Sequence, residues 1–290
     1  MLSKGATVVE IKHYFQEKLA SHFSDREVKF IVKTILCRRL NYSSIDLLTR
    51  NDAIISLSDI QYFQKVIDRL LEGEPFQYIA ETTFFYNIDL KIDKRALIPR
   101  PETEELVDWI VSDFKNKKSL HILDVGTGSG CISLALKNEM PNWKITGIDI
   151  SKEAISLAQA NAKCLNLVVD FHQLDVFEIE KTELKKLKFD VIVSNPPYIP
   201  KSDESKMKNH VLHHEPQQAL FVGDEDPLIF YKKIASIAKL QLNDEGTLYL
   251  EINEDLGEAT IDLLKKMGFK NCQLRQDLQG KDRMIRAKKE

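Results

Sequence analysis

The stretch His121-Ile122-Leu123-Asp124-Val125-Gly126-Thr127-Gly128-Ser129-Gly130 decides the fold. Its first five residues have the apolar and β-branched character of a buried strand, and an apolar helical segment follows over residues 132–136. Glycines between a strand and a helix let the backbone turn sharply and approach a ligand without a clash from Cβ. The stretch therefore predicts a ligand-binding loop at the carboxyl end of a strand.

Helix and strand alternate around this stretch from Thr103 onward. Further strands are expected at 144–150, 168–173, 189–194, 247–252 and 284–287, and apolar helical segments lie between most of them. This alternation is typical of an α/β fold with a mostly parallel sheet that is covered by helices on both faces.

The first 80 residues have a different pattern. Apolar residues recur there at helical spacing, so we expect a small helical bundle in which Ser58 caps the third helix and Gly73 ends it. Residues 82–92 are aromatic and β-branched, which predicts a hairpin with Asn87 in its turn. The two prolines of Leu97-Ile98-Pro99-Arg100-Pro101 exclude a regular helix there.

The spacing of the glycines favours one class of ligand. Dinucleotide-binding loops have G-x-G-x-x-G, whereas residues 126–130 form G-x-G-x-G after an acid, Asp124. S-adenosylmethionine has no phosphate but carries a zwitterionic amino acid end. Asp124 suits its positive end, and the backbone amides of Gly126, Thr127, Gly128, Ser129 and Gly130 suit its carboxylate.

Three residues after the next two strands complete the predicted cofactor site. Asp149 ends the second strand and is placed to accept the ribose hydroxyls. Asp175 follows the third strand, where it is placed to accept the adenine amino group beside the Val176 backbone.

The fourth predicted strand runs directly into Asn195-Pro196-Pro197-Tyr198. Because ligands of open α/β sheets bind at the carboxyl ends of strands, this tetrapeptide lies on the same edge as the glycine loop. The Asn195 side-chain carbonyl and the Pro196 backbone carbonyl can each accept an N–H from a planar amide or exocyclic amino group. Two such bonds orient the nitrogen toward a methyl donor, and Tyr198 offers a ring face to the planar group.

At this point the chain resembles the release-factor glutamine methyltransferases (the PrmC/HemK family) over nearly its whole length. The matching segments are residues 73–79, 97–104, 124–130, 149–151, 194–199, Glu215-Pro216, Ala219-Leu220, Gly223 and 277–283. The resemblance implies a class I S-adenosylmethionine-dependent methyltransferase: a Rossmann-like, mostly parallel seven-stranded sheet. It also implies an N-terminal helical substrate-binding domain (1–80), a β-hairpin linker (81–95) and a catalytic domain (96–290).

The resemblance further implies a reaction. The substrate is the glutamine of the Gly-Gly-Gln loop of peptide chain release factors, methylated at its side-chain nitrogen N5, with S-adenosylhomocysteine as by-product. Asn195 to Tyr198 hold that glutamine, and Gly126–Gly130, Asp149, Val176 and Asn195 contact the cofactor. The chain departs from the family at Glu81, where glycine is usual, at Asn253, which follows Glu251-Ile252 in place of glycine, and at Asp226-Pro227-Leu228.

Two further residues near the predicted site have either a structural or a functional interpretation. Arg100, between two prolines, closes over the cofactor or substrate, or else pairs with an acid. Glu215 shapes the substrate pocket, or else forms part of a turn with Pro216. His213 and His214 are adjacent and have no second cluster of ligands, and the four cysteines form no Cys-x-x-Cys pair, so we expect no metal.

Two alternative functions stay open. An adenine-N6 methyltransferase of DNA or RNA shares the tetrapeptide, but it needs a basic and aromatic region to flip a base, and no such insert is visible. A non-catalytic adaptor is the second alternative, although the intact tetrapeptide and glycine loop argue against it.

Charge and hydropathy indicate a compartment and a class of partner. The net charge is −3, so a broad nucleic-acid-binding surface is not expected. No apolar run approaches the roughly 20 residues of a membrane helix, and the first ten residues lack the layout of a signal peptide. We therefore expect a cytoplasmic protein that does not associate with membranes.

Overall fold

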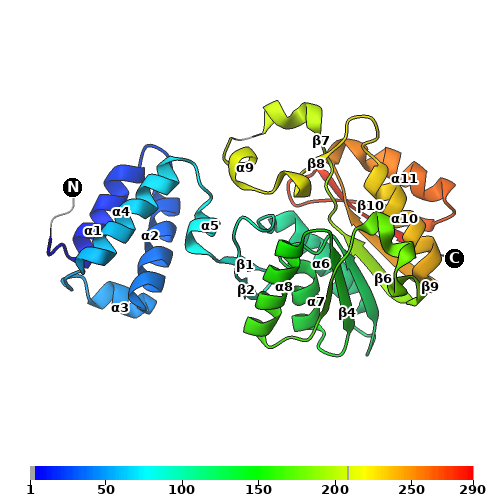
Figure 1. Cartoon of the computed structure of the whole chain (residues 1–290), viewed down its shortest axis with the longest axis horizontal. Helices are drawn as coiled ribbons and strands as arrows, with labels where there is room; N and C mark the ends of the chain where they lie inside the picture. The colour runs from blue at the N-terminus through cyan, green and yellow to red at the C-terminus, as the bar shows by residue number, and fades with distance from the viewer. Residues whose placement is uncertain (1–3, 208, 290) are drawn as a thin grey trace. The chain divides into compact units, whose positions relative to one another are not determined.

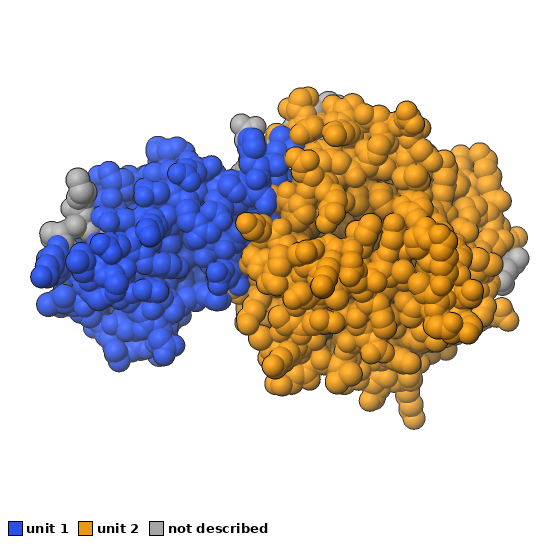
Figure 2. All heavy atoms as spheres, viewed as in Figure 1, with its two compact units in different colours: residues 1–81, 209–214 blue, residues 82–208, 215–290 orange. Residues whose placement is uncertain are grey.

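The computed structural model of the chain describes residues 4–207 and 209–289. The chain divides into two compact units, drawn in different colours in Figure 2. One unit runs to Glu81 and includes Asn209–His214, and the other comprises the rest of the chain. No helix among the described residues is both long enough and apolar enough to cross a membrane.

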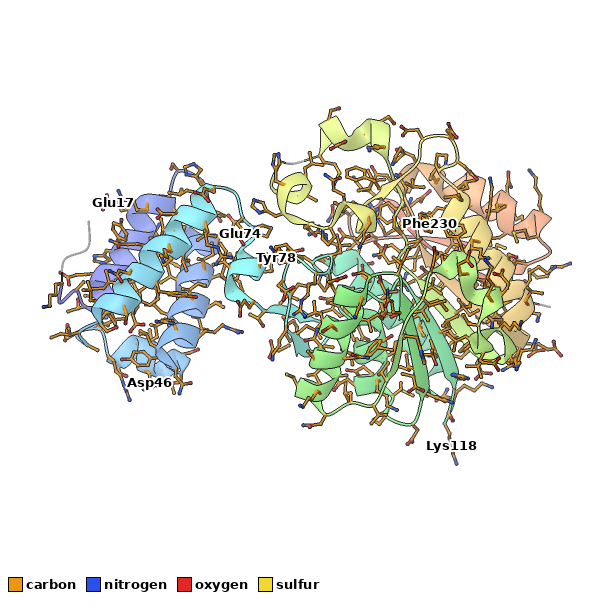
Figure 3. All side chains as sticks on the ribbon, in the orientation of Figure 1. Glu17, Asp46, Glu74, Tyr78, Lys118 and Phe230 are labelled. Carbon is orange, nitrogen blue, oxygen red and sulfur yellow. The ribbon has the colours of Figure 1, made fainter. Side chains whose placement is uncertain are left out.

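The first unit is helical (Figure 1). Its helices are α1 (Val8–Leu19), α2 (Asp25–Leu40), α3 (Ser44–Thr49), α4 (Leu57–Leu71), α5 (Phe76–Ala80) and α9 (Asn209–His214). Apolar residues at helical spacing form its core, in which Phe15 and Phe63 meet edge to face with ring centroids 6.1 Å apart. Figure 3 shows Glu17 on α1 and Asp46 on α3 among the side chains of this unit.

The start of α4 differs from the sequence prediction, whereas its end agrees with it. Ser56, and not Ser58, caps α4, because its hydroxyl accepts the N–H of Asp59 while Ser58 lies inside the helix. Gly73 follows the end of α4 with a left-handed φ of 84°, the conformation that favours glycine. Glu81, where the family usually has glycine, ends α5 with a left-handed φ of 52°, so the usual glycine has a conformational explanation.

The second unit begins with a tight hairpin. Strands β1 (Thr83–Phe85) and β2 (Ile88–Leu90) pair antiparallel, with Phe85 opposite Ile88. Tyr86 and Asn87 form the turn with φ values of 37° and 68°, the conformation of a two-residue hairpin turn.

The main sheet has seven strands in the order β10-β11-β9-β6-β3-β4-β5. They are β3 (His121–Val125), β4 (Lys144–Asp149), β5 (Asp170–Gln173), β6 (Phe189–Ser194), β9 (Leu242–Glu251), β10 (Lys270–Gln276) and β11 (Asp282–Lys288). The two pairings of β11, with β10 and with β9, are antiparallel, and the other pairings of this sheet are parallel. The predicted Rossmann-like, mostly parallel seven-stranded sheet is confirmed.

Strand β10 was not among the strands expected from the sequence. It lies at the edge of the sheet, and most of its side chains are exposed. Its polar residues therefore lack the apolar run that marks a buried strand. Pro101 also differs from expectation, because it begins helix α6 (Pro101–Phe114), where its fixed φ suits the first helical position.

Alternate residues of the strands build two cores. Helices α6, α7 (Cys131–Glu139) and α8 (Lys152–Leu165) cover one face with Ile122 and Val193, while α10 (Ile229–Gln241) and α11 (Gly257–Lys266) cover the other with Leu123 and Ile192. The two layers of helices are visible in Figure 1. This burial on both faces is the arrangement that parallel sheets require.

The strand order places the candidate site. The chain passes from β3 outward to β4 and β5, and then returns to β6 on the other side of β3. The carboxyl ends of β3 and β6 thus lie side by side where the order reverses, which is where open α/β sheets bind ligands.

Candidate active site

A cavity of about 430 Å³ opens at this reversal point. Its walls come from the loops after β3, β4, β5 and β6, from the segment before α6, and from residues 216–221. The residues of the predicted site that line it are Gly126, Gly128, Asp149, Asp175, Val176, Asn195, Pro196 and Pro197.

The glycine loop wraps closely against β4. Gly126, Gly128 and Gly130 all have left-handed φ values, between 56° and 82°. The amides of Gly126 and Thr127 both donate to the Ile148 carbonyl at 2.9 Å, and the Gly130 amide donates to the Thr127 carbonyl at 2.8 Å. These amides stabilise the loop itself and are not free to bind a carboxylate, contrary to the expectation for this loop.

Three of the predicted cofactor residues in the loop do not line the cavity. Thr127 and Ser129 are buried, and their side chains are turned into the protein. Gly130 is a packing position, since a Cβ there would lie 3.1 Å from Ala158 Cβ, from Leu134 and from Phe171.

Asp124 lies fully buried beneath the loop. Its Oδ2 accepts the hydroxyls of Thr127 at 2.6 Å and Ser133 at 2.7 Å. Its Oδ1 is also buried, and within the described part of the chain it has no hydrogen-bond partner. Burial raises the pKa of Asp124 to about 6. An unpartnered buried carboxylate oxygen is costly, so this atom is available to a cation or a hydrogen-bond donor, although Asp124 itself does not line the cavity.

The two acids after β4 and β5 lie at the cavity wall. Asp149 accepts the Gly128 amide on Oδ2 and the Ser151 amide on Oδ1, both at 2.9 Å, which holds the carboxylate in one orientation. Burial raises the pKa of Asp149. Asp175 accepts the Phe177 amide at 2.9 Å and so caps the short 3₁₀ helix that begins at Val176.

Asn195 and Tyr198 are anchored by one buried carboxylate that the sequence reasoning did not place in the site. Asn195 Nδ2 donates to Thr103 Oγ1 at 3.1 Å, and Thr103 Oγ1 donates to Glu251 Oε2 at 2.7 Å. The Tyr198 hydroxyl donates to Glu251 Oε1 at 3.2 Å. The Tyr198 ring packs against the core beside α10 and does not line the cavity.

Glu251 is a buried acid whose pKa is far from that of an ordinary carboxyl group. It stands at the end of β9 and is 1% exposed. Burial raises the pKa of Glu251 to about 7. A signal for it was present in the sequence, since an acid closes the apolar run of residues 247–252 on the edge that carries the site.

Asn253, one of the departures from the family pattern, supports the backbone of the tetrapeptide at Tyr198. Its Nδ2 donates to the Tyr198 carbonyl at 3.3 Å, and its Oδ1 accepts the Asp255 amide at 2.9 Å. Its φ of −64° needs no glycine.

Arg100 and Glu215 pair with each other outside the cavity wall. Arg100 Nη2 donates to Glu215 Oε1 at 2.6 Å, and the Ile98 amide donates to Glu215 Oε2 at 3.1 Å. Glu215 is 4% exposed. The pair therefore ties the segment before α6 to the segment at Pro216, both of which contribute to the cavity wall.

The cavity also has apolar walls that the sequence reasoning missed. Ile150, Leu174 and Phe177 surround the space beside Asp149 and Asp175. Phe177 and Phe230 lie with ring centroids 5.5 Å apart, and Figure 3 shows Phe230 near the start of α10. A flat apolar group between such walls is well accommodated.

No group of three or more His, Cys, Asp or Glu side chains suited to a metal is present among the described residues. His214 is half-buried and His213 is exposed.

Comparison with known proteins adds to this geometry. Residues 116–258 match the family profile described as "Methyltransferase domain", and residues 10–80 match "PrmC N-terminal domain". The release factor glutamine methyltransferase of Flavobacterium psychrophilum is 39% identical, over 96% of this chain and 98% of that protein. The one from Streptococcus pneumoniae is 40% identical, over 92% of this chain and 97% of that protein.

Among solved structures, a methyltransferase from Pyrococcus furiosus matches with a TM-score of 0.51 and 18% identity, over 76% of this chain and 96% of that one. This likeness concerns the fold alone. The two relatives, by contrast, match this chain in sequence from the helical unit through the sheet. The chain therefore belongs to the release factor glutamine methyltransferase family, as its sequence resemblance predicted.

Proposed function

We propose that this protein transfers a methyl group from S-adenosylmethionine to the side-chain nitrogen N5 of the glutamine in the Gly-Gly-Gln loop of peptide chain release factors. S-adenosylhomocysteine is the by-product. One observation carries the proposal. Asn195 lies at the cavity with its Nδ2 held by Thr103, so its carbonyl is the end of the amide left to receive a substrate N–H.

The residues around the cavity fit S-adenosylmethionine. The Asp149 carboxylate suits the ribose hydroxyls, and Ile150, Leu174 and Phe177 offer apolar walls for a purine beside Asp175 and the Val176 backbone. The spare Oδ1 of Asp124 suits the positive amino acid end, directly or through water. When bound, the cofactor supplies an electrophilic methyl group on a sulfonium.

The tetrapeptide would prepare the glutamine nitrogen. An amide nitrogen is a poor nucleophile because its lone pair is delocalised. Asn195 Oδ1 and the Pro196 carbonyl each accept one of its two N–H groups, which fixes its direction and stabilises the positive charge that develops as the nitrogen gains the methyl group. The methylated nitrogen then loses one proton, so no strong general base is required.

We also assign a role to each region of the chain. The helical region 1–80 helps to bind the release factor, residues 81–95 link it to the catalytic region, and residues 96–290 carry the reaction. Relatives named for the same reaction match both the helical and the catalytic regions. Because release factors act on ribosomes, the proposed substrate also places the protein in the cytoplasm.

Transfer of labelled methyl groups tests the proposal. The protein is incubated with methyl-labelled cofactor and either a release factor, the same factor with its Gly-Gly-Gln glutamine changed to alanine, or duplex DNA. Label is expected in the intact release factor alone. Label in DNA alone would establish the adenine methyltransferase instead, and no label in any substrate would favour the non-catalytic adaptor.

A further inference from the structure

The direction of the Asn195 amide decides whether this site works. A side-chain amide has a carbonyl end that accepts hydrogen bonds and an NH₂ end that only donates them. If the amide turned over, its NH₂ would face the N–H groups of the substrate, and an attractive contact would become a repulsive one. The groups that fix this direction are therefore as important as Asn195 itself.

Thr103 provides the contact that sets the direction. Its hydroxyl has one proton, and that proton is donated to Glu251 Oε2 at 2.7 Å. Toward Asn195 the hydroxyl can then act only as an acceptor, so it receives the Nδ2 group at 3.1 Å. Thr103 is 2% exposed, so water does not compete for these bonds.

Glu251 connects both side chains of the tetrapeptide. Its other oxygen, Oε1, accepts the Tyr198 hydroxyl at 3.2 Å. An ionised carboxylate only accepts hydrogen bonds, so both neighbouring hydroxyls must point their protons toward it. A protonated Glu251 is itself a donor, and it would free the Thr103 proton to turn toward Asn195.

We infer that Glu251 is a positioning residue for methyl transfer: its ionised carboxylate, acting through the Thr103 hydroxyl, holds the Asn195 carbonyl toward the substrate. The inference rests on the proposed function, because it concerns the same transfer. Glu251 itself touches neither the proposed substrate nor the cofactor cavity.

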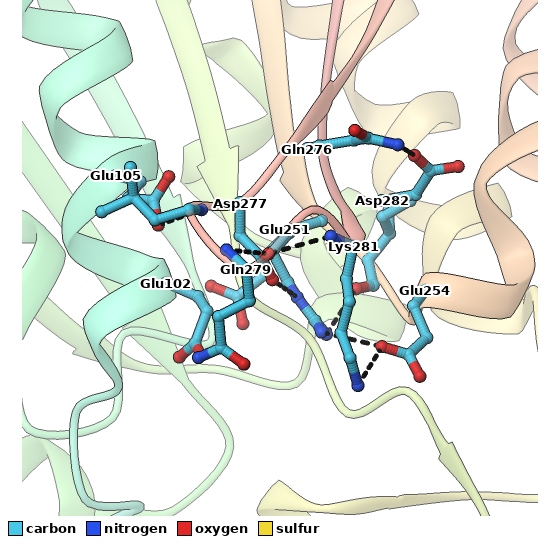
Figure 4. Close-up of polar contacts among 12 residues, drawn as sticks. Glu102, Glu105, Glu251, Glu254, Gln276, Asp277, Gln279, Lys281 and Asp282 are labelled. Atoms are coloured by element: carbon cyan, nitrogen blue, oxygen red, sulfur yellow. Dashed lines mark hydrogen bonds and ion pairs between the residues drawn. The ribbon is translucent and has the colours of Figure 1, made fainter.

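Charged and titratable groups from several elements surround Glu251. Glu102 on α6 and Cys131 on α7 interact with it electrostatically, as does Tyr231 on α10. Arg283 on β11 favours the ionised form, and it also pairs with Asp277 at 3.2 Å and with Glu254 at 3.3 Å. The Asp277 loop is closed by Gln279 and Lys281, whose amides donate to Asp277 Oδ1, and Figure 4 shows it beside Glu251.

The arrangement predicts a pH dependence with a defined sign. Burial raises the pKa of Glu251 to about 7. Only the ionised form directs the Thr103 proton away from Asn195. We therefore expect kcat to reach its plateau above that pH and to fall as the pH drops through it, which gives the pH profile an acidic limb. Glu102→Gln, which removes a nearby negative charge, should move this limb to lower pH without removing it.

Three variants test the inference. Thr103→Val keeps the shape but removes the hydroxyl, and Glu251→Gln keeps the shape but removes the charge. Both should lower kcat roughly tenfold to a hundredfold, the scale for one misplaced group in a preorganised site. Both should also lose the acidic limb, with KM for the cofactor unchanged. Thr103→Ser, which restores the hydroxyl, should recover activity.

Thr260→Val is the matched control. Thr260 is likewise a buried helical threonine, on α11, and its hydroxyl has no partner among the described residues. Its substitution should leave kcat and the pH profile as in the wild type. Wild-type kcat with an unchanged acidic limb in Thr103→Val, or in Glu251→Gln, would overturn the inference.

A second measurement separates this inference from the proposed function. In the cofactor-free protein the NMR signals of the Asn195 side-chain NH₂, identified by their loss in Asn195→Asp, should shift with a midpoint near the Glu251 pKa of about 7. The shift should vanish in Glu251→Gln and in Thr103→Val. Signals that do not titrate in the wild type would overturn the inference even if the release factor is methylated. A titrating signal without methylation would support the inference and count against the proposed function.

Discussion

Two loops meet at the cavity, and each rests on one buried carboxylate. The glycine loop after β3 covers Asp124, and the tetrapeptide after β6 rests on Glu251. Asp124 keeps one oxygen without a partner among the described residues, whereas both oxygens of Glu251 accept hydroxyls. The comparison teaches that a buried carboxylate can serve two purposes. One with an unpartnered oxygen can receive a ligand, whereas one whose two oxygens both accept hydrogen bonds can only hold its neighbours in place.

The largest expected effect comes from removing the group that Glu251 is inferred to hold. Asn195→Ala should reduce kcat roughly 10²- to 10³-fold, because one preorganised hydrogen bond to the reacting group is lost. Cofactor affinity, measured by calorimetry, should change little. Retained activity would contradict the assignment of Asn195 to the substrate amide.

The second effect concerns stability and compares the two acids directly. Burial raises the folded-state pKa of Glu251 to about 7 and that of Asp124 to about 6. A carboxyl with a raised pKa binds its proton more tightly in the folded state, so its contribution to stability is present at low pH and is lost as the pH rises through the folded pKa.

From pH 5 to pH 8 this linkage should cost the wild type roughly 3 kcal/mol at Glu251 and about half of that at Asp124. Urea unfolding at several pH values measures it. Glu251→Gln should flatten the dependence more than Asp124→Asn does. A larger flattening in Asp124→Asn than in Glu251→Gln would contradict the higher pKa of Glu251.

The third effect tests the spare oxygen. Asp124→Asn should weaken cofactor binding roughly tenfold to a hundredfold, which is the scale of one lost charge-assisted hydrogen bond. In the wild type the affinity should fall as the pH drops below about 6, because burial raises the pKa of Asp124 to that value and only the ionised form attracts the cofactor's positive end. Unchanged affinity in Asp124→Asn would remove the role assigned to Oδ1.

The smallest expected effect is on the free energy of unfolding, at an unpartnered polar atom to which we assign no ligand. The Thr260 hydroxyl is buried on α11 without a partner among the described residues. Thr260→Val should therefore raise the free energy of unfolding by about 1 kcal/mol, because an unsatisfied polar group is removed at constant shape. A loss of stability on thermal unfolding would show that this hydroxyl has a partner after all.

The parallel strands and the glycine loop were predictable from sequence because buried parallel strands are apolar and their loops carry glycine and acids. Strand β10 was not, since at the sheet edge its side chains are mostly exposed. The cap of α4 was placed at Ser58 instead of Ser56 because both residues are serines before the same apolar segment.

The candidate site was predictable only in part, because some residues that meet in it lie far apart along the chain. Asp124, Asp149, Asp175 and Asn195 each lie at or just after the carboxyl end of a strand, so their place at one edge follows from topology. Thr103 and Glu251 lie 148 positions apart, and only the packing of α6 against β9 makes them neighbours. No local pattern marks such a pair. The bonding of the Gly126 and Thr127 amides was likewise not predictable, because the Ile148 carbonyl that they share lies on β4.

The position of β9 in the strand order has a consequence for protein synthesis. A ribosome delivers β3 to β6 first, so a nascent chain that stops before Leu242 already contains every strand that supports the glycine loop. It lacks the strand that carries Glu251, and it leaves β6 as an open edge. Tyr198 would then lack the partner of its hydroxyl, and Thr103 would lack the carboxylate that orients it toward Asn195. An interrupted translation product would therefore retain the cofactor half of the site without a fully supported substrate half.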